Sequence, residues 1–304
     1  MATPDATRTT AGATLIAHCG VDSDSAVIEQ ALREEGTWTQ WEVTTSTTEL
    51  NAALTRHHAA LRTSSAGTPI VVMPLTSGRN LTLIADTAKV CQWFTHTHPE
   101  APLLLAPAPL HDVPTVAWLR AALRTLTTDA DLAVICSAAI DPFADAELFR
   151  LARLAWTNSS GADVLVAFDD AYPSISQVVA PHQALAAASA SSQKIAVIRA
   201  DLRAPEGQTP LLRSRALSQA IAASLANALH LYRDHGDNGI AAALLTDHAH
   251  GYAHSHGEDS HSHGHTHHHS HGHGHGHHSH THHHSHTHHH SQHHHMEGGG
   301  NAGN

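Results

Sequence analysis

Short apolar runs alternate with longer Ala- and Leu-rich stretches along the first 246 residues. The clearest run is PIVVMPL at Pro69–Leu75, whose nearly unbroken apolar character is typical of a strand buried on both faces. The stretches between such runs have helical periodicity, as Leu50, Leu54 and Leu61 show within Glu49–Arg62. This alternation predicts the α/β class, in which a parallel sheet is covered by helices.

The same pattern sets the bounds of each expected element. The predicted strands are Thr14–Ala17, Trp41–Thr45, Pro69–Leu75, Leu103–Ala106, Ala133–Cys136, Val164–Phe168 and Lys194–Arg199. The predicted helices are Ala26–Glu35, Glu49–Arg62, Leu81–Thr97, Val113–Leu126, Ala144–Trp156, Ile175–Ser189 and Arg213–Tyr232. Ser23 or Ser25 is expected to cap the first helix, and Asp112 the fourth.

The order of elements starts again after Asp129. LIAHCGVDSD, from Leu15, aligns with VICSAAIDPF, from Val134, and pairs His18 with Ser137. We therefore predict two tandem domains over residues 12–127 and 128–235, each with a parallel sheet flanked by helices. Residues 1–11 and a His-rich tail over 236–304 are predicted to be disordered.

The amino-acid composition changes near Asp247, which divides the chain into a body and a His-rich tail. Of the 35 histidines, 26 lie between His248 and His295, and residues 247–304 contain no Lys or Arg. Such a segment cannot bury enough apolar surface to offset the entropy of ordering, so it stays disordered unless it binds something. Residues 1–246 carry a formal charge of −7 and have the apolar content of a packed globular unit.

These numbers exclude several classes of protein. An acidic body without a Lys/Arg stripe is a poor binder of nucleic acid. No apolar run approaches a membrane span, and the N-terminus lacks the pattern of a signal peptide. Three widely spaced cysteines form no CxxC pair, which favours a reducing cytoplasm. We expect no nucleotide cofactor. A homodimer is one option for the oligomeric state.

The tail predicts metal binding. Imidazole suits Ni²⁺, Co²⁺, Cu²⁺ and Zn²⁺, and a ligand at almost every second residue gives many overlapping sites. Binding should disappear as the pH falls through about 6.5, where imidazole is protonated. The alternative is a solvated, pH-sensitive linker. The candidate tail ligands are His261, His263, His265, His267, His268, His269, His271, His273, His275, His277, His278, His280, His282, His283, His284, His286, His288, His289 and His290.

Two strand-to-helix turns in the first half carry further candidate chemistry. His18 and Cys19 follow the first strand, and Gly78-Arg79-Asn80 follows the third. Side chains at the carboxyl ends of parallel strands gather at one edge of the sheet, where ligands usually bind. A neutral imidazole can bind a metal or accept a proton, although a structural histidine in such a turn is common.

These motifs, with the Pro-Leu-His segment around His111 and the Asp141–Glu147 run, resemble the sirohydrochlorin chelatase (CbiX) family, and its actinobacterial members most. These class II chelatases insert a divalent metal into a tetrapyrrole. The resemblance covers roughly residues 12–200 and implies two flavodoxin-like domains. It also implies a lyase-type reaction on a sirohydrochlorin-like substrate in cobalamin or sirohaem-type synthesis, most simply with Co²⁺, or with Ni²⁺, Zn²⁺ or Fe²⁺.

The resemblance assigns roles residue by residue. His18 matches the family histidine that binds the metal and accepts pyrrole protons. Asn80 stands where the family has a second histidine, so Cys19 and His111 are the further candidate metal ligands. Gly78, Arg79 and Asn80 would contact the substrate, with Arg79 pairing with its carboxylates. The alternatives without a functional role are a buried free thiol for Cys19, a solvated residue at the start of a helix for His111 and a surface residue in a turn for Arg79.

Three functions follow from these assignments. The favoured one is a chelatase to which the tail delivers metal, because a tether raises the local metal concentration. The second is a non-catalytic store or chaperone for nickel, cobalt or zinc on a degenerate chelatase scaffold, motivated by the missing second histidine. The third is a subunit that binds a tetrapyrrole without metallating it.

Overall fold

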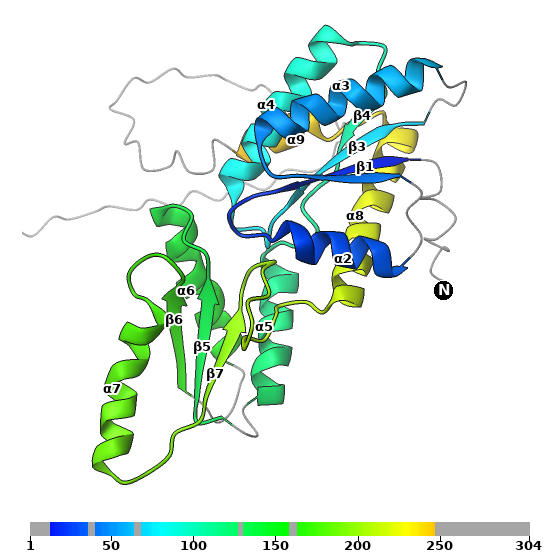
Figure 1. Ribbon diagram of the computed structural model, residues 1–304. Helices are drawn as coiled ribbons and strands as arrows, with labels where there is room; N and C mark the ends of the chain where they lie inside the picture. The colour runs from blue at the N-terminus through cyan, green and yellow to red at the C-terminus, as the bar shows by residue number, and fades with distance from the viewer. Residues whose placement is uncertain (1–12, 36–39, 64–67, 127–129, 158–162, 247–304) are drawn as a thin grey trace, which may run out of the picture. The chain divides into compact units, whose positions relative to one another are not determined.

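Parallel strands and helices make up the part of the chain that this computed structural model describes, residues 13–35, 40–63, 68–126, 130–157 and 163–246. Its strands are β1 (Thr14–Cys19), β2 (Trp41–Thr44), β3 (Ile70–Leu75), β4 (Leu103–Leu105), β5 (Leu132–Ser137), β6 (Asp163–Phe168) and β7 (Ile195–Arg199). Its helices are α2 (Ser25–Glu35), α3 (Thr47–Thr63), α4 (Leu81–Thr97), α5 (Asp112–Leu126), α6 (Pro142–Trp156), α7 (Ile175–Ala188), α8 (Ser214–His235) and α9 (Ile240–Leu244). The α/β prediction is confirmed (Figure 1).

The first sheet has the strand order β2-β1-β3-β4, and all its pairs are parallel. Its central strand β1 is buried along its whole length. Because successive side chains point to opposite faces, Leu15 and Ala17 join the core under α2 and α8, whereas Ile16 joins the core under α3 and α4. Both faces of this sheet are therefore covered by helices (Figure 1).

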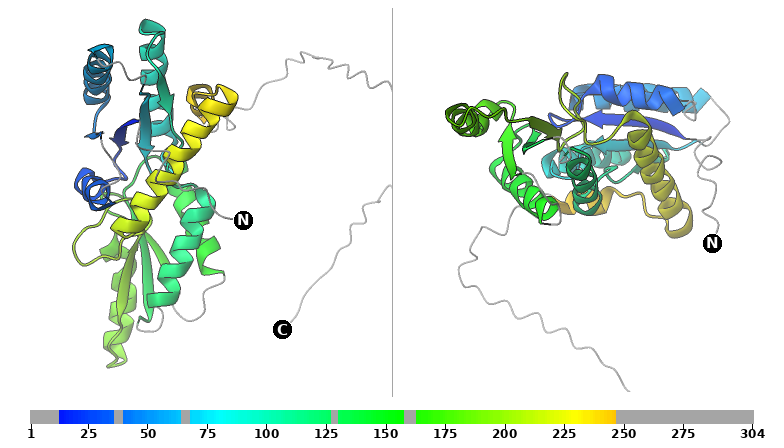
Figure 2. Two further views of the ribbon diagram at one scale, coloured as in Figure 1. Left: turned by 90° about the vertical axis from the view of Figure 1, so that its right-hand side faces the viewer. Right: turned by 90° about the horizontal axis from the view of Figure 1, so that it is seen from below.

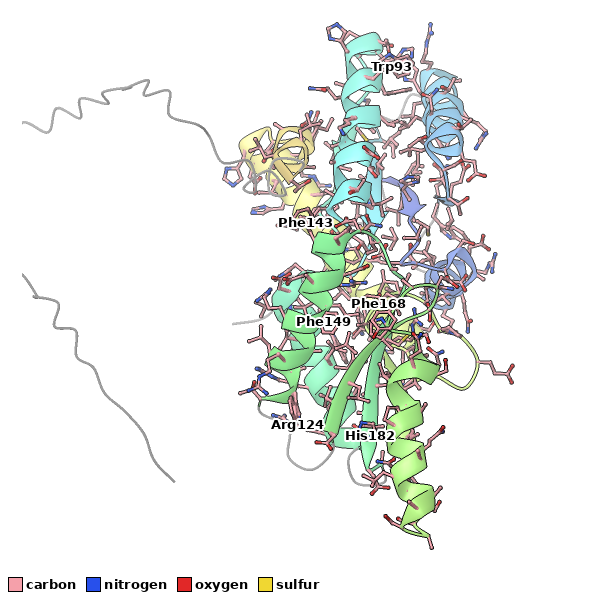
Figure 3. All side chains as sticks on the ribbon, turned by 90° about the vertical axis from the view of Figure 1, so that its left-hand side faces the viewer. Trp93, Arg124, Phe143, Phe149, Phe168 and His182 are labelled. Atoms are coloured by element: carbon pink, nitrogen blue, oxygen red, sulfur yellow. The ribbon has the colours of Figure 1, made fainter. Side chains whose placement is uncertain are left out.

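The second sheet repeats part of that order. Its strands run β6-β5-β7, which corresponds to β2-β1-β3 without a fourth strand. Helices α5 and α6 pack together over one face, and α7 packs on β6 over the other. Phe149 of α6 lies beside Phe168 at the end of β6, with 6.1 Å between the ring centroids (Figure 3). The repeat of topology agrees with the weak repeat in sequence.

Two helices pack on the sheet of the other predicted half of the chain. Helix α5 packs on α6 and β7, although it precedes every strand of the second sheet. Helix α8 packs on α2 and β4, although it follows β7 (Figures 1 and 2). A cut between residues 127 and 128 would thus separate α5 from its packing partners, so the predicted bounds of 12–127 and 128–235 follow chain order rather than packing.

Most predicted elements are present with bounds shifted by a few residues, and Leu81–Thr97 is identical. The first helix is capped by Asp24, whose carboxylate accepts from the Ala26 amide at 2.9 Å, rather than by the predicted serines. The predicted tail also begins too early. Its first residues, 236–246, include helix α9, which packs on α4 and β4 because Ile240 is buried there.

None of the helices in the described ranges combines the length and apolar character needed to cross a membrane.

Candidate functional site

The loops that follow β1 and β3 meet at the carboxyl edge of the first sheet. In the order β2-β1-β3-β4, the connection from β1 leads to β2 on one side, and the chain then crosses to β3 on the other side of β1. Open parallel sheets usually bind ligands in the crevice outside such a switch point, here between β1 and β3. Here the crevice holds the side chains of Asp22, Thr76 and Asn80, all buried. The protein's own polar groups therefore occupy the place where a ligand was predicted.

Both polar atoms of the Asn80 side-chain amide are hydrogen-bonded within the protein. Its Oδ1 accepts from the Leu83 amide at 3.0 Å and caps α4, and its Nδ2 donates to Asp22 Oδ1 at 2.9 Å. The other oxygen of Asp22 accepts from the hydroxyl of Thr76. Burial raises the pKa of Asp22, against the opposing effect of these two hydrogen bonds. Asn80 thus has a structural role.

Arg79 points into the second half of the chain. Its Nη1 donates to the carbonyl of Ala144 at 2.7 Å, and its Nη2 donates to the Ser137 hydroxyl and, at 3.2 Å, to the Ala138 carbonyl. The side chain is fully buried, and Asp145 lies 3.9 Å from Nη1. The guanidinium therefore ties the turn after β3 to the end of β5. Both Nη atoms are engaged within the protein, whereas Nε is buried without a hydrogen-bond partner, so burial rather than full pairing keeps the group from a substrate carboxylate.

The ends of β5 and β7 continue this network. The Ser137 hydroxyl donates to Asp201 at 3.1 Å, and the Ala138 amide donates to the same carboxylate at 2.8 Å. The guanidinium of Arg199 donates to both oxygens of Asp201. Arg199 and Asp201 are fully buried, and buried charges of this kind persist only when they are paired and hydrogen-bonded.

His18 lies beside this network without joining it. It is 2% exposed, and its Nδ1 is 2.9 Å from the hydroxyl of Thr44 on β2. Burial lowers the pKa of His18, while the contact with Thr44 and the charge of Glu49 oppose that shift. The imidazole is therefore held neutral, as a ligand or base requires. It is not in any cluster of three metal-ligating groups among the described residues.

Cys19 and His111 are not brought to His18 as a ligand set. Cys19 is buried, and its burial raises the pKa of the thiol to about 12, so it is protonated at neutral pH. His111 is exposed and belongs to no three-ligand cluster in the described ranges.

Gly78 and His111 line a cavity of about 490 Å³. It lies among the ends of β3 and β4, the first turns of α4, and α8 and α9, and its other lining residues include Leu81, Leu105 and Leu110. Gly78 has φ +97°, and a Cβ there would lie 2.7 Å from the His111 Cα. The lining contains Asp112 and Asp237 but no Lys or Arg, which suits a small, largely apolar ligand better than a polycarboxylate.

The tail histidines that were predicted to bind metal, from His261 to His290, lie outside the described residues.

A separate group of metal-ligating side chains, which sequence reasoning missed, lies at the opposite edge of the first sheet. It consists of His58, His98 and Glu100. The signal was present as the THTHPE segment that precedes β4, and as the His57-His58 pair of α3. It was missed because ligands are expected at the carboxyl ends of parallel strands, whereas this group lies at the amino ends.

The chain matches no protein-family model, and no curated protein is similar to it.

Proposed function

We propose that this protein binds divalent transition metal ions through its His-rich tail, on a body that resembles a tetrapyrrole chelatase but does not insert metal. The observation that carries the proposal is the tail itself, with 26 histidines between His248 and His295 and no cysteine. Imidazole without thiolate favours Ni²⁺, Co²⁺ and Zn²⁺, bound at three or four nitrogens per ion. A store or chaperone for these metals fits this composition.

The carboxyl edge of the first sheet supports the non-catalytic form of this proposal. Metal insertion into a tetrapyrrole needs a ligand that releases the ion and bases that accept two pyrrole protons. His18 is one such group, but Asn80 is engaged with Leu83 and Asp22, and Arg79 with Ser137 and Ala144. The body would have to break these buried hydrogen bonds to present a substrate site.

The test of metal binding compares two full-length proteins, the natural chain and one in which all 26 tail histidines are replaced by Ser. Equilibrium dialysis against Ni²⁺ or Co²⁺ should give several ions per natural chain at pH 7.5 and most of them lost at about pH 5.5. The substituted chain should lose nearly all of that stoichiometry. Equal binding by the two chains would contradict the proposal.

Chelatase activity is a second candidate function, favoured by one observation. His18 lies at the carboxyl end of the central strand β1, with its pKa lowered by burial, where the resemblance implies a metal-binding base. Insertion of Co²⁺ into sirohydrochlorin, followed by absorbance, decides between the two. Acceleration over the metal-only control that His18→Ala abolishes would establish the enzyme, and a rate equal to the control would remove it.

A further inference from the structure

Three side chains that can bind a metal converge at the amino edge of the first sheet. His58 lies on α3, His98 is the C-cap of α4, and Glu100 belongs to the turn between α4 and β4. Because helices that cross over a parallel sheet end near the amino ends of the strands, this topology brings residues 40 positions apart to one edge. The group is thus distinct from the carboxyl-edge network and from the tail.

The ligand atoms have nearly the spacing of a first coordination shell. His58 Nε2 lies 3.1 Å from Glu100 Oε1, and His98 Nδ1 lies 4.0 Å from the same oxygen. All three ligand atoms lie within 4.8 Å of one another. Tetrahedral Zn²⁺ with bonds of about 2.0–2.1 Å places its ligand atoms about 3.3 Å apart. The Glu100 side chain is 60% exposed, so it can move the remaining ångström or so.

The burial of His58 also points to a ligand. Its side chain is 9% exposed, and Nε2 is buried without a hydrogen-bond partner. The carboxylate of Glu100 is its ion-pair partner, with Nε2 and Oε1 3.1 Å apart. Coordination of a metal ion by this buried nitrogen would give it a bonded partner.

The two imidazoles are held in place by Phe94 of α4. The Phe94 ring contacts His58 edge-on at 5.9 Å between centroids and His98 at 4.6 Å, and the imidazole centroids are 4.8 Å apart. The His98 backbone is also fixed on both sides, since its amide donates to the Phe94 carbonyl at 2.8 Å and its carbonyl accepts from Ala101 at 3.0 Å. Rings restrained in this way lose little freedom when they bind an ion.

We propose that His58, His98 and Glu100 form a structured binding site for one Zn²⁺ or a similar divalent transition metal ion, with water in the remaining position. Two imidazoles and a carboxylate form a ligand set that Zn²⁺ adopts in proteins with one position left open. This site goes beyond the proposed function, because it takes one ion per chain at the body rather than many in the tail.

The experiment uses the full-length chain in which the 26 tail histidines are replaced by Ser, so that the tail no longer competes. Calorimetric titration with Zn²⁺ should give one ion per chain. His98→Ala and Glu100→Gln should each weaken the Kd by about tenfold to a hundredfold or more, since loss of even an outer partner of a metal ligand has effects of that size. The double variant should show no saturable binding.

A matched control is His96→Ala, an exposed histidine on the same helix that is not in the group, and it should leave the Kd unchanged. Co²⁺ in place of Zn²⁺ should give the strong visible absorption of four-coordinate cobalt. The side chains of His98 and Glu100 are 37% and 60% exposed, so their variants should keep the circular dichroism of the parent.

Two results would overturn the proposal. One is the absence of stoichiometric Zn²⁺ binding to the tail-substituted chain. The other is binding that persists in the double variant. The tail proposal fails separately, because it requires the natural chain to bind several ions more than the tail-substituted one.

Discussion

The buried histidines at the two edges of the first sheet, His18 and His58, have different surroundings. At the carboxyl edge, His18 lies beside a network in which the amide of Asn80 and the guanidinium of Arg79 are hydrogen-bonded to other parts of the protein. At the amino edge, His58 Nε2 is buried without a hydrogen-bond partner, and His98 and Glu100 lie within reach. Both imidazoles are buried. Among the described residues, the second imidazole belongs to a group of three ligand atoms within 4.8 Å of one another, and the first belongs to no such group.

This difference teaches that position in a parallel sheet is not sufficient for a binding site. The rule that ligands bind at the carboxyl ends of strands describes where crevices form, and the side chains decide whether a crevice stays open. Here the crevice between β1 and β3 is filled by charged and amide groups whose hydrogen bonds are made within the protein.

The largest effect is expected from Arg79→Met. This change removes donors from Ser137, Ala138 and Ala144 and leaves the buried carboxylate of Asp22 without a nearby cation. Removal of one partner from a buried ionic network costs about 3–5 kcal/mol. Urea denaturation should show a loss of this size in the free energy of unfolding.

The control for this change is Arg150→Met. Arg150 pairs with Asp112 and Glu147 on the surface, where its side chain is 49% exposed. Exposed ion pairs contribute about 0–1 kcal/mol, so this variant should lose no more than that. Similar losses in the two variants would indicate that Arg79 is not a structural tie and is free to bind a substrate.

A smaller loss is expected from Asn80→Ala. The variant removes the cap of α4 and also the donor to Asp22, which together should cost about 2–3 kcal/mol. Ser174→Ala removes the capping box of α7 at a half-buried position and should cost about 1 kcal/mol. Equal losses in the two variants would mean that the hydrogen bond from Asn80 to Asp22 contributes no stability. The Asn80 side chain would then be less firmly held in its structural role.

The elements were predictable from the sequence to a large extent, for a physical reason. Strands buried on both faces, such as Ile70–Leu75, leave continuous apolar runs, and helices such as Leu81–Thr97 leave a periodic pattern. Helix α9 was missed because it has only five residues and lies next to a polar tail. The packing of α5 and α8 on the sheet of the other predicted half depends on contacts between the halves, which no local pattern encodes.

The candidate sites were predicted less well. Sequence patterns placed His18, Gly78, Arg79 and Asn80 near one edge, but they could not tell whether these side chains were free or engaged. The direction of the Arg79 guanidinium toward Ser137 depends on how the loops of the two halves meet. The group of His58, His98 and Glu100 depends on the packing of α3 against α4, which brings distant positions together.

Gly78→Ala should test how closely the turn at Gly78 packs against His111, beside the cavity that both residues line. At φ +97°, an alanine is strained, and its Cβ would lie 2.7 Å from the backbone of His111. Gly207→Ala is the matched control, because Gly207 has φ +76° with nothing within 4 Å of a Cβ. Thermal or urea unfolding should show a loss for Gly78→Ala about 1–2 kcal/mol greater than for the control. Equal losses would show that the turn can move away from His111.

The smallest effect concerns His18 and pH. Because burial lowers its pKa below 6.5, the unfolded chain takes up a proton at His18 at a higher pH than the folded protein does. Stability contributed by the neutral imidazole is therefore present above pH 6.5 and is lost as the pH falls from there toward the lowered pKa. The loss from one group is at most about 1.4 kcal/mol per pH unit.

His18→Gln should remove that contribution, so its free energy of unfolding should fall less between pH 7 and pH 5 than that of the natural chain. His96→Gln serves as the control for the substitution itself, because His96 is exposed on α4. If His18→Gln gave a profile parallel to that of the natural chain, the imidazole would be protonated equally in the folded and unfolded states. His18 would then be accessible, and the contrast between the two edges of the sheet would disappear.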